Sequence, residues 1–198
     1  MKLRALAAFA TCACATTLGA GICDASAQKA ATRTGVPIDV MLTITRLETG
    51  RGAAAEPWPW TVNHAGAGSW FQSEDEARAF VFSKVKQGAS NIDIGCFQIN
   101  YRWHGQGFSS LDDMFNPDLN ALYAAEFLSE LHREFGSWTE AAGAYHSRTP
   151  EYAERYKSKF RSLRSHVAEL ATMLPTQDAH LALSPNWGTA ASSRVRMH

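Results

Sequence analysis

Residues 36–50 read Val-Pro-Ile-Asp-Val-Met-Leu-Thr-Ile-Thr-Arg-Leu-Glu-Thr-Gly, and this stretch carries a helix signal. The apolar residues that recur on one helix face are Val40, Met41, Ile44 and Leu47. Pro37 is a residue type favoured where helices begin, and Gly50 is one at which they end. The pattern predicts an amphipathic helix whose apolar face packs against a core.

Glu48 is the unusual residue of this helix, because its position four residues after Ile44 places a carboxyl group on the apolar face. It also lies in the last turn, where the helix dipole disfavours a negative charge. Burial and the dipole both favour the protonated form, so we expect the pKa of Glu48 to be raised. Such an acid can donate a proton to a glycosidic oxygen. An ion pair with Arg46 or Arg51 is the structural alternative.

The rest of the chain is dominated by helix signals. Capping residues and prolines predict further helices at about residues 73–88, 116–131, 137–145 and 149–167. Two short strands, at residues 58–63 and 69–71, are expected to flank a turn, and residues 93–100 form an apolar run that we expect to be extended. We therefore predict a mainly α fold of the α+β type, in which a helical domain holds a small β-hairpin element.

The composition is that of a globular protein without a charge bias. The 198 residues include 19 basic and 19 acidic side chains, and 45% of them are hydrophobic. This composition excludes a disordered chain, and the lack of a basic excess argues against a dedicated nucleic-acid binder. The seven histidines show no spacing typical of metal ligands, so we expect neither a metal nor another cofactor.

Residues 1–27 have the three parts of a secretory signal peptide. Lys2 and Arg4 provide the positive start, an uncharged stretch rich in alanine follows, and Ala25-Ser26-Ala27 forms a small-x-small cleavage pattern. We expect cleavage after Ala27 and export to the periplasm or the medium. A permanent membrane helix is disfavoured because Thr, Gly and Cys dilute the apolar stretch.

The expected mature chain has a domain at residues 28–174 and a flexible tail at residues 175–198, where no periodicity is sustained. Cys12, Cys14 and Cys23 would leave with the signal peptide. Cys96 then remains alone, so we expect a buried thiol and no internal disulfide.

Three short motifs place Glu48 in a wider pattern. They are Leu47-Glu48-Thr49, Gly95-Cys96-Phe97-Gln98 and Ala144-Tyr145-His146. Their order and spacing resemble the soluble lytic transglycosylases, a family with a lysozyme-like fold and the pattern Glu-Ser, Gly-Leu-Met-Gln and Ala-Tyr-Asn. The resemblance covers about residues 34–165, and the segment 58–63 looks like the exported form of the family from Gram-negative bacteria. Thr49, Cys96-Phe97 and His146 depart from the family pattern.

The resemblance implies that the chain cleaves the β-1,4 bond between N-acetylmuramic acid and N-acetylglucosamine in peptidoglycan, and that it leaves 1,6-anhydro ends. Glu48 is then the catalytic residue. The residues expected to bind the substrate are Thr49, Asn63, Phe97, Gln98, Asn100, Tyr145 and His146. On an extended backbone, Gln98 would share a face with Cys96 and Asn100.

Two other functions stay open. A lysozyme-type hydrolase is the nearer one, because Asp93 or Glu56 is available as a second carboxylate. A wall-binding or secretion-assembly protein with a vestigial site is the other. The expected partner is the glycan strand of peptidoglycan, and a secretion or flagellar apparatus is a further candidate. We expect a monomer that binds no nucleic acid and is not inserted in a membrane after signal cleavage.

Overall fold

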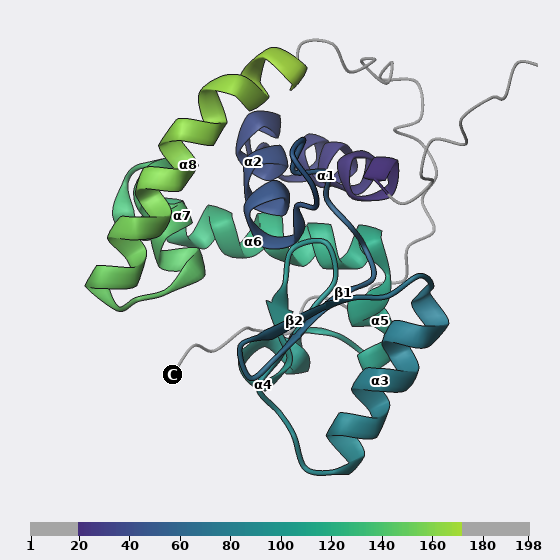
Figure 1. Cartoon of the computed structure of the whole chain (residues 1–198). Helices are drawn as coiled ribbons and strands as arrows, with labels where there is room; N and C mark the ends of the chain where they lie inside the picture. Colours follow the sequence, from purple (N-terminus) through teal and green to yellow (C-terminus); the bar gives the residue numbers. More distant parts are fainter. Residues whose placement is uncertain (1–19, 172–198) are drawn as a thin grey trace, which may run out of the picture.

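The computed structural model describes residues 20–171, which form a mainly α domain with one small sheet (Figure 1). The helices are α1 (Ala20–Thr34), α2 (Ile38–Thr49), α3 (Glu74–Lys86), α4 (Tyr101–His104), α5 (Leu111–Phe115), α6 (Pro117–Phe135), α7 (Trp138–His146) and α8 (Pro150–Ala171). A short 3-10 turn, Gly105–Gly107, follows α4. The predicted fold class is confirmed.

Helix α2 forms the centre of the helical part, where it packs against both α1 and α8 (Figure 1). Helix α1 also packs against α6, and α7 packs against α6 and α8. Val40, Met41 and Ile44, on the predicted apolar face of α2, are fully buried. The core is therefore built around the helix that carries Glu48.

The strands form one antiparallel sheet in the order β2-β1-β3-β4, in the lower part of Figure 1 together with α3. The strands are β1 (Thr61–His64), β2 (Ala67–Trp70), β3 (Ile92–Ile94) and β4 (Ile99–Asn100). Asp93 of β3 is paired with Asn63 of β1 on one side and with Asn100 of β4 on the other. Because residues directly opposite each other point to the same face of a sheet, this register groups three polar side chains.

Polar side chains cap the helices at the predicted starts. Ser73 Oγ accepts a hydrogen bond of 3.3 Å from the Glu76 N–H, and Ser137 Oγ accepts one of 3.2 Å from the Glu140 N–H. Asn116 caps α6 through a hydrogen bond of 3.0 Å from the Asp118 N–H. These bonds satisfy backbone donors that the first turn of a helix leaves free.

Residues 93–100 do not form the extended run that the sequence predicts. Strand β3 ends at Ile94, and residues 95–98 form a turn closed by a hydrogen bond of 3.1 Å from the Gln98 N–H to the Gly95 carbonyl. Gly95 has a φ of +81° and Gln98 one of +47°. Gly95 is the physical reason for the turn, because glycine adopts this left-handed region at little cost. Gln98 consequently does not share an extended face with Cys96 and Asn100.

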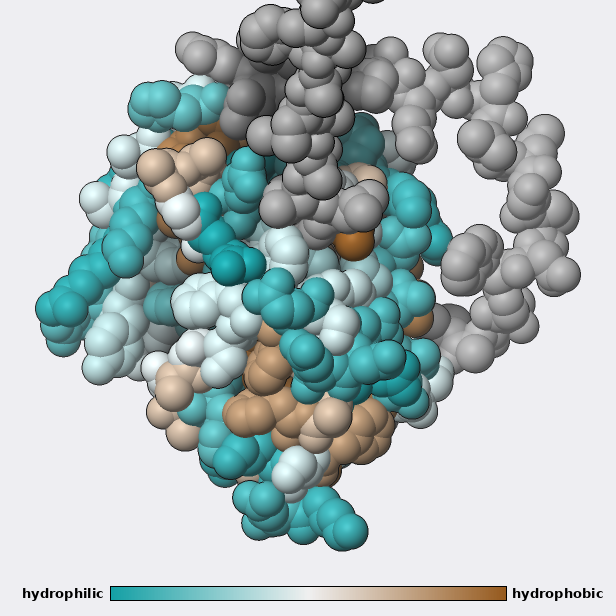
Figure 2. All heavy atoms as spheres, turned by 45° about the vertical axis from the view of Figure 1, so that its right-hand side comes forward, coloured by the Kyte–Doolittle hydropathy of each residue, from teal (hydrophilic) through white to brown (hydrophobic). Residues whose placement is uncertain are grey.

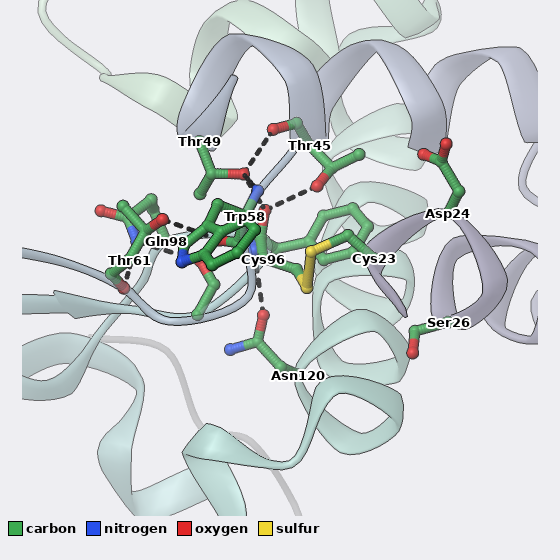
Figure 3. The surroundings of a disulfide bond; sticks show 12 residues. Cys23, Asp24, Ser26, Thr45, Thr49, Trp58, Thr61, Cys96, Gln98 and Asn120 are labelled. Carbon is green, nitrogen blue, oxygen red and sulfur yellow. Dashed lines mark hydrogen bonds between the residues drawn. A yellow bond between two sulfur atoms is a disulfide. The ribbon is translucent and has the colours of Figure 1, made fainter. Parts of the chain in front are cut away.

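Cys96 forms a disulfide with Cys23 (Figure 3), so the prediction of a lone thiol and no disulfide is wrong. Both cysteines are fully buried. The physical reason is that residues 20–27 belong to α1, which packs against α6 and α2. Small residues such as those in this stretch allow close packing of helices, and the same residue types resemble a cleavage pattern.

The structure describes residues 20–27 of the proposed leader and none of the proposed tail. Residues 1–19 and 172–198 lie outside the described residues, so the export signal and the tail at residues 175–198 remain predictions. The cleavage position also remains untested, although Ala25-Ser26-Ala27 lies within α1 and the described domain begins before residue 28.

On the face shown in Figure 2, polar side chains predominate, and apolar side chains gather on its lower part. Phe82 of α3 is one of the exposed large apolar residues, with 44% of its surface accessible. Between residues 20 and 171, no helix combines the length and the hydropathy that crossing a membrane requires.

Candidate active site

A cleft of about 330 Å³ lies between the sheet and the helical part of the molecule. Six of the residues predicted from the sequence line it: Glu48, Asn63, Gln98, Asn100, Tyr145 and His146. They come from α2, β1, the β3–β4 turn, β4 and the end of α7. The fold therefore brings together residues that are spread over about half of the chain.

Thr49 and Phe97, which were also predicted to bind substrate, do not line the cleft. Both are fully buried. Thr49 Oγ1 donates a hydrogen bond of 2.9 Å to the Thr45 carbonyl, and it accepts one of 3.3 Å from the Trp58 N–H. The Phe97 carbonyl accepts a hydrogen bond of 2.7 Å from the Tyr145 hydroxyl. The two residues support the cleft from behind.

Glu48 lies at the end of α2, and 15% of its side chain is exposed. Burial raises the pKa of Glu48 to about 7 and is the largest influence on it. A hydrogen bond from Tyr156 lowers this pKa, and the negative charge of Asp93 raises it. The predicted direction of the shift is therefore confirmed.

Neither of the ion pairs considered for Glu48 is formed. Arg46 binds Asp24 instead, at 2.7 Å. The guanidinium group of Arg51 lies over the Trp58 ring, 4.8 Å from its centroid. Glu48 is consequently a mostly buried acid without an arginine partner.

Tyr156 of α8 is a site residue that the sequence analysis missed. Its hydroxyl donates a hydrogen bond of 2.7 Å to Glu48 Oε1. Burial, followed by the nearby Glu48, raises the pKa of Tyr156 well above its ordinary value, so the hydroxyl remains a donor. In the sequence, Tyr156 falls on the apolar period of its helix, which predicts packing alone. Its 108-residue separation from Glu48 conceals the contact.

His146 lies beside the same carboxyl group. Its Nδ1 is 4.0 Å from Glu48 Oε1, and its ring stacks on Tyr156 with centroids 4.5 Å apart. Burial and, to a smaller extent, the charge of Lys159 lower the pKa of His146. The lowered pKa favours the neutral imidazole, a form that can both donate and accept hydrogen bonds.

A second hollow of about 190 Å³, which we call the α8 pocket, adjoins the cleft. Glu48 and His146 line both spaces. Residues of α8 line the α8 pocket but not the cleft, among them Tyr152, Arg155 and Lys159. Glu48 thus lies where two hollows meet.

The turn that carries Gln98 is held by Asn120, a fully buried amide of α6. Asn120 Nδ2 donates a hydrogen bond of 3.0 Å to the Ile94 carbonyl, and its Oδ1 accepts one of 3.0 Å from the Phe97 N–H. A Cβ atom on Gly95 would lie 2.9 Å from Asn120 Nδ2. The close approach therefore requires glycine at this position. Asn120 had not been singled out from the sequence, where it is one polar residue within a helix.

Gln98 uses its amide nitrogen to bind its own turn and the neighbouring strand β1. Its Nε2 donates hydrogen bonds of 3.0 Å to the carbonyls of Thr61 and Gly95 (Figure 3). Because a primary amide has two N–H groups, the amide oxygen is the part of Gln98 that is left for a ligand.

Asp93 is a second carboxyl group in the cleft, whereas Glu56 is exposed and does not line it. Burial raises the pKa of Asp93, and a hydrogen bond of 2.6 Å from Asn100 Nδ2 opposes this rise. Glu56 instead faces Arg51 in an isolated β-bridge. Of the two alternatives, the structure therefore leaves Asp93 as the candidate for a second carboxylate.

Trp103 provides an aromatic surface in the cleft, since it lines this space and is 69% exposed. Trp58 differs, because its indole N–H donates a hydrogen bond of 2.7 Å to the Phe71 carbonyl and the residue does not line the cleft. Trp103 therefore offers an exposed aromatic ring to a ligand in the cleft.

Comparison with known proteins gives a family match. Residues 58–166, more than half of the chain, match the family described as the transglycosylase SLT domain. No curated protein and no solved structure shows a significant match. The matched segment begins after Glu48 and contains Gln98, Tyr145, His146 and Tyr156.

Proposed function

Because the chain belongs to the transglycosylase SLT domain family, we propose that it is a lytic transglycosylase that cleaves the β-1,4 bond between N-acetylmuramic acid and N-acetylglucosamine in peptidoglycan. The observation that carries this proposal is Glu48, a mostly buried acid whose pKa is raised to about 7 where the cleft and the α8 pocket meet. An acid with this pKa is available in both protonation states near neutral pH.

Glu48 acts twice in the proposed reaction. Its carboxyl group first donates a proton to the glycosidic oxygen, and the C1–O4 bond breaks so that N-acetylglucosamine leaves with a 4-hydroxyl group. The resulting carboxylate then takes the proton from the C6 hydroxyl of the muramoyl sugar, as O6 forms a bond with C1. The product has a 1,6-anhydro end, no water is consumed and Glu48 is protonated again. The substrate supplies its own nucleophile, so one carboxyl group is sufficient.

The neighbours of Glu48 favour this alternation. The hydrogen bond from Tyr156 stabilises the carboxylate, while burial and the charge of Asp93 favour the acid. These opposing influences keep the pKa near 7, which lets one group serve as acid and as base.

Hydrolysis is the second candidate, because Asp93 lines the same cleft. A hydrolase of the usual type uses its second carboxylate as a base or a nucleophile. Burial raises the pKa of Asp93, and Asn100 already occupies one of its oxygens. We infer that Asp93 adjusts the pKa of Glu48, because its negative charge favours the protonated form of that acid.

Export of the protein is also part of the proposal. The disulfide between Cys23 and Cys96 supports it, because such bonds persist in oxidising compartments and are rare in the reducing cytosol. The charged start and the uncharged stretch of residues 1–22 support it from the sequence.

Mass spectrometry of peptidoglycan digests tests the reaction. We expect muropeptides with anhydro ends, which are lighter by one water than reducing ends, and no incorporation of label from heavy-oxygen water. Glu48→Gln should abolish their release, whereas Glu56→Gln, which changes an exposed glutamate outside the cleft, should not. Labelled reducing ends would instead support hydrolysis, and full activity of Glu48→Gln would exclude Glu48 as the catalyst.

A further inference from the structure

The residues of the predicted cleavage pattern Ala25-Ser26-Ala27 are integral to the folded domain. Ser26 and Ala27 are buried, and their helix α1 packs against α6 and α2. Ser26 Oγ donates a hydrogen bond of 2.6 Å to Asp118 Oδ1, at the start of α6. The packing of α1 against its neighbours therefore accounts for the small, buried residues of this pattern without a cleavage site.

Cleavage after Ala27 would also remove the partner of a mostly buried arginine. Asp24 Oδ1 and Oδ2 accept hydrogen bonds of 2.7 and 2.9 Å from the two terminal nitrogens of Arg46. The Arg46 side chain is 11% exposed, and its other hydrogen bond is one of 3.1 Å to the Leu42 carbonyl. Loss of Asp24 would leave a buried guanidinium group without a counter-charge, which is strongly unfavourable.

The same cleavage would break the link between α1 and the cleft. Cys23 is bonded to Cys96, which directly precedes Phe97 and Gln98 in the turn (Figure 3). The Cys96 carbonyl also accepts a hydrogen bond of 2.8 Å from Thr45 Oγ1 of α2. The disulfide therefore attaches the N-terminal helix to the turn that lines the candidate active site.

From these contacts we propose that the leader is removed upstream of Cys23, by hydrolysis of the peptide bond between Ala20 and Gly21. Ala20 is a small residue directly before this bond, Gly19 is small as well, and both follow the uncharged stretch that starts at Ala5. Water adds across the bond, so that Ala20 gains a carboxylate and Gly21 becomes the new amino terminus.

The exported chain then contains two cysteines, Cys23 and Cys96. Their thiols pass two electrons and two protons to a thiol oxidase of the oxidising compartment as the disulfide forms. This inference rests on the proposed export and does not depend on the reaction that Glu48 catalyses.

The test is expression of the full chain in a Gram-negative bacterium, followed by N-terminal sequencing of the exported protein. Alkylation of the protein with and without prior reduction counts its thiols. We expect Gly21 as the first residue, no alkylated cysteine before reduction and two after it. An exported chain that begins at Gln28 and carries one free thiol would overturn the processing proposal and leave export standing. A cytoplasmic chain that keeps Met1 would overturn export itself.

Two variants distinguish the proposed cleavage site from the downstream pattern. Ala20→Arg should block cleavage, because it places a large charged residue directly before the proposed bond. Ala25→Arg is the matched control, since Ala25 is exposed on α1 and the same change would spoil the downstream pattern. We expect the Ala25→Arg protein to begin at Gly21. If instead Ala25→Arg blocks processing and Ala20→Arg does not, the proposed site is wrong.

Discussion

Replacing Cys23 and Cys96 with alanine removes the covalent link between α1 and the turn that carries Gln98. Reduction of the wild-type bond removes the same link but retains both sulfur atoms. Comparing the two perturbations separates the constraint imposed by the bond from the packing of the sulfur atoms, which are buried in the core.

The expected loss of stability follows from the size of the closed loop. The two cysteines are 73 residues apart. A disulfide across a loop of this length restricts the unfolded chain enough to contribute about 4 kcal/mol to the free energy of unfolding. For a domain of this size, 1 kcal/mol corresponds to roughly 2–4 °C in Tm, so reduction should lower Tm by roughly 8–16 °C.

Urea unfolding of the exported protein, followed by circular dichroism with and without dithiothreitol, measures this loss. The wild type should lose about 4 kcal/mol on complete reduction. The Cys23→Ala/Cys96→Ala variant should be equally stable with and without reductant, which controls for any other effect of the reagent. A loss below about 1 kcal/mol in the fully reduced wild type would refute the reasoning, because it would mean that the bond does not constrain the unfolded chain.

Three further predictions concern the pKa of Glu48. Tyr156→Phe removes a hydrogen bond that lowers this pKa, so the alkaline limb of the pH–activity profile should move to higher pH. Asp93→Asn removes a charge that raises the same pKa, so that limb should move to lower pH, and a common direction for the two variants would contradict both assignments. Because the folded-state pKa of about 7 exceeds the ordinary 4.5, the free energy of unfolding should fall as the pH rises between these values. The Glu48→Gln variant should not show that fall, and above pH 7 its free energy of unfolding should exceed that of the wild type by up to about 3 kcal/mol. Urea titrations at several pH values measure this difference. If the free energies of unfolding of the two proteins changed in parallel with pH, the prediction would be wrong.

Patterns of neighbouring residues predicted the starts of α3, α6 and α7 correctly. Ser73, Asn116 and Ser137 cap their helices through bonds to residues two or three positions onward, so these contacts are already implied by the order of the residues. The burial of Glu48 follows in the same way from its spacing to Ile44.

Predictions failed where one local pattern fits two structures. The expectation of a lone Cys96 thiol assumed that residues 20–27 leave the chain, whereas these residues belong to α1 and Cys23 pairs with Cys96. Thr49 adjoins Glu48, yet consecutive residues of a helix point about 100° apart, so its hydroxyl faces the core. A glycine in an apolar run at residues 93–100 introduced a turn that reoriented Gln98.

Where the helices begin, and which face buries an acid, depends on residues a few positions apart, and the order of amino acids alone specifies both. The groups that meet this acid come from distant parts of the chain: Tyr156 from α8 and Asp93 from β3. Desolvation and charge act through space and not along the chain, so the pKa of about 7 that suits Glu48 to its proposed task arises only in the folded molecule. The pairing of Cys23 with Cys96 likewise arises only in the folded molecule, because it requires α1 to lie against the turn that carries Gln98.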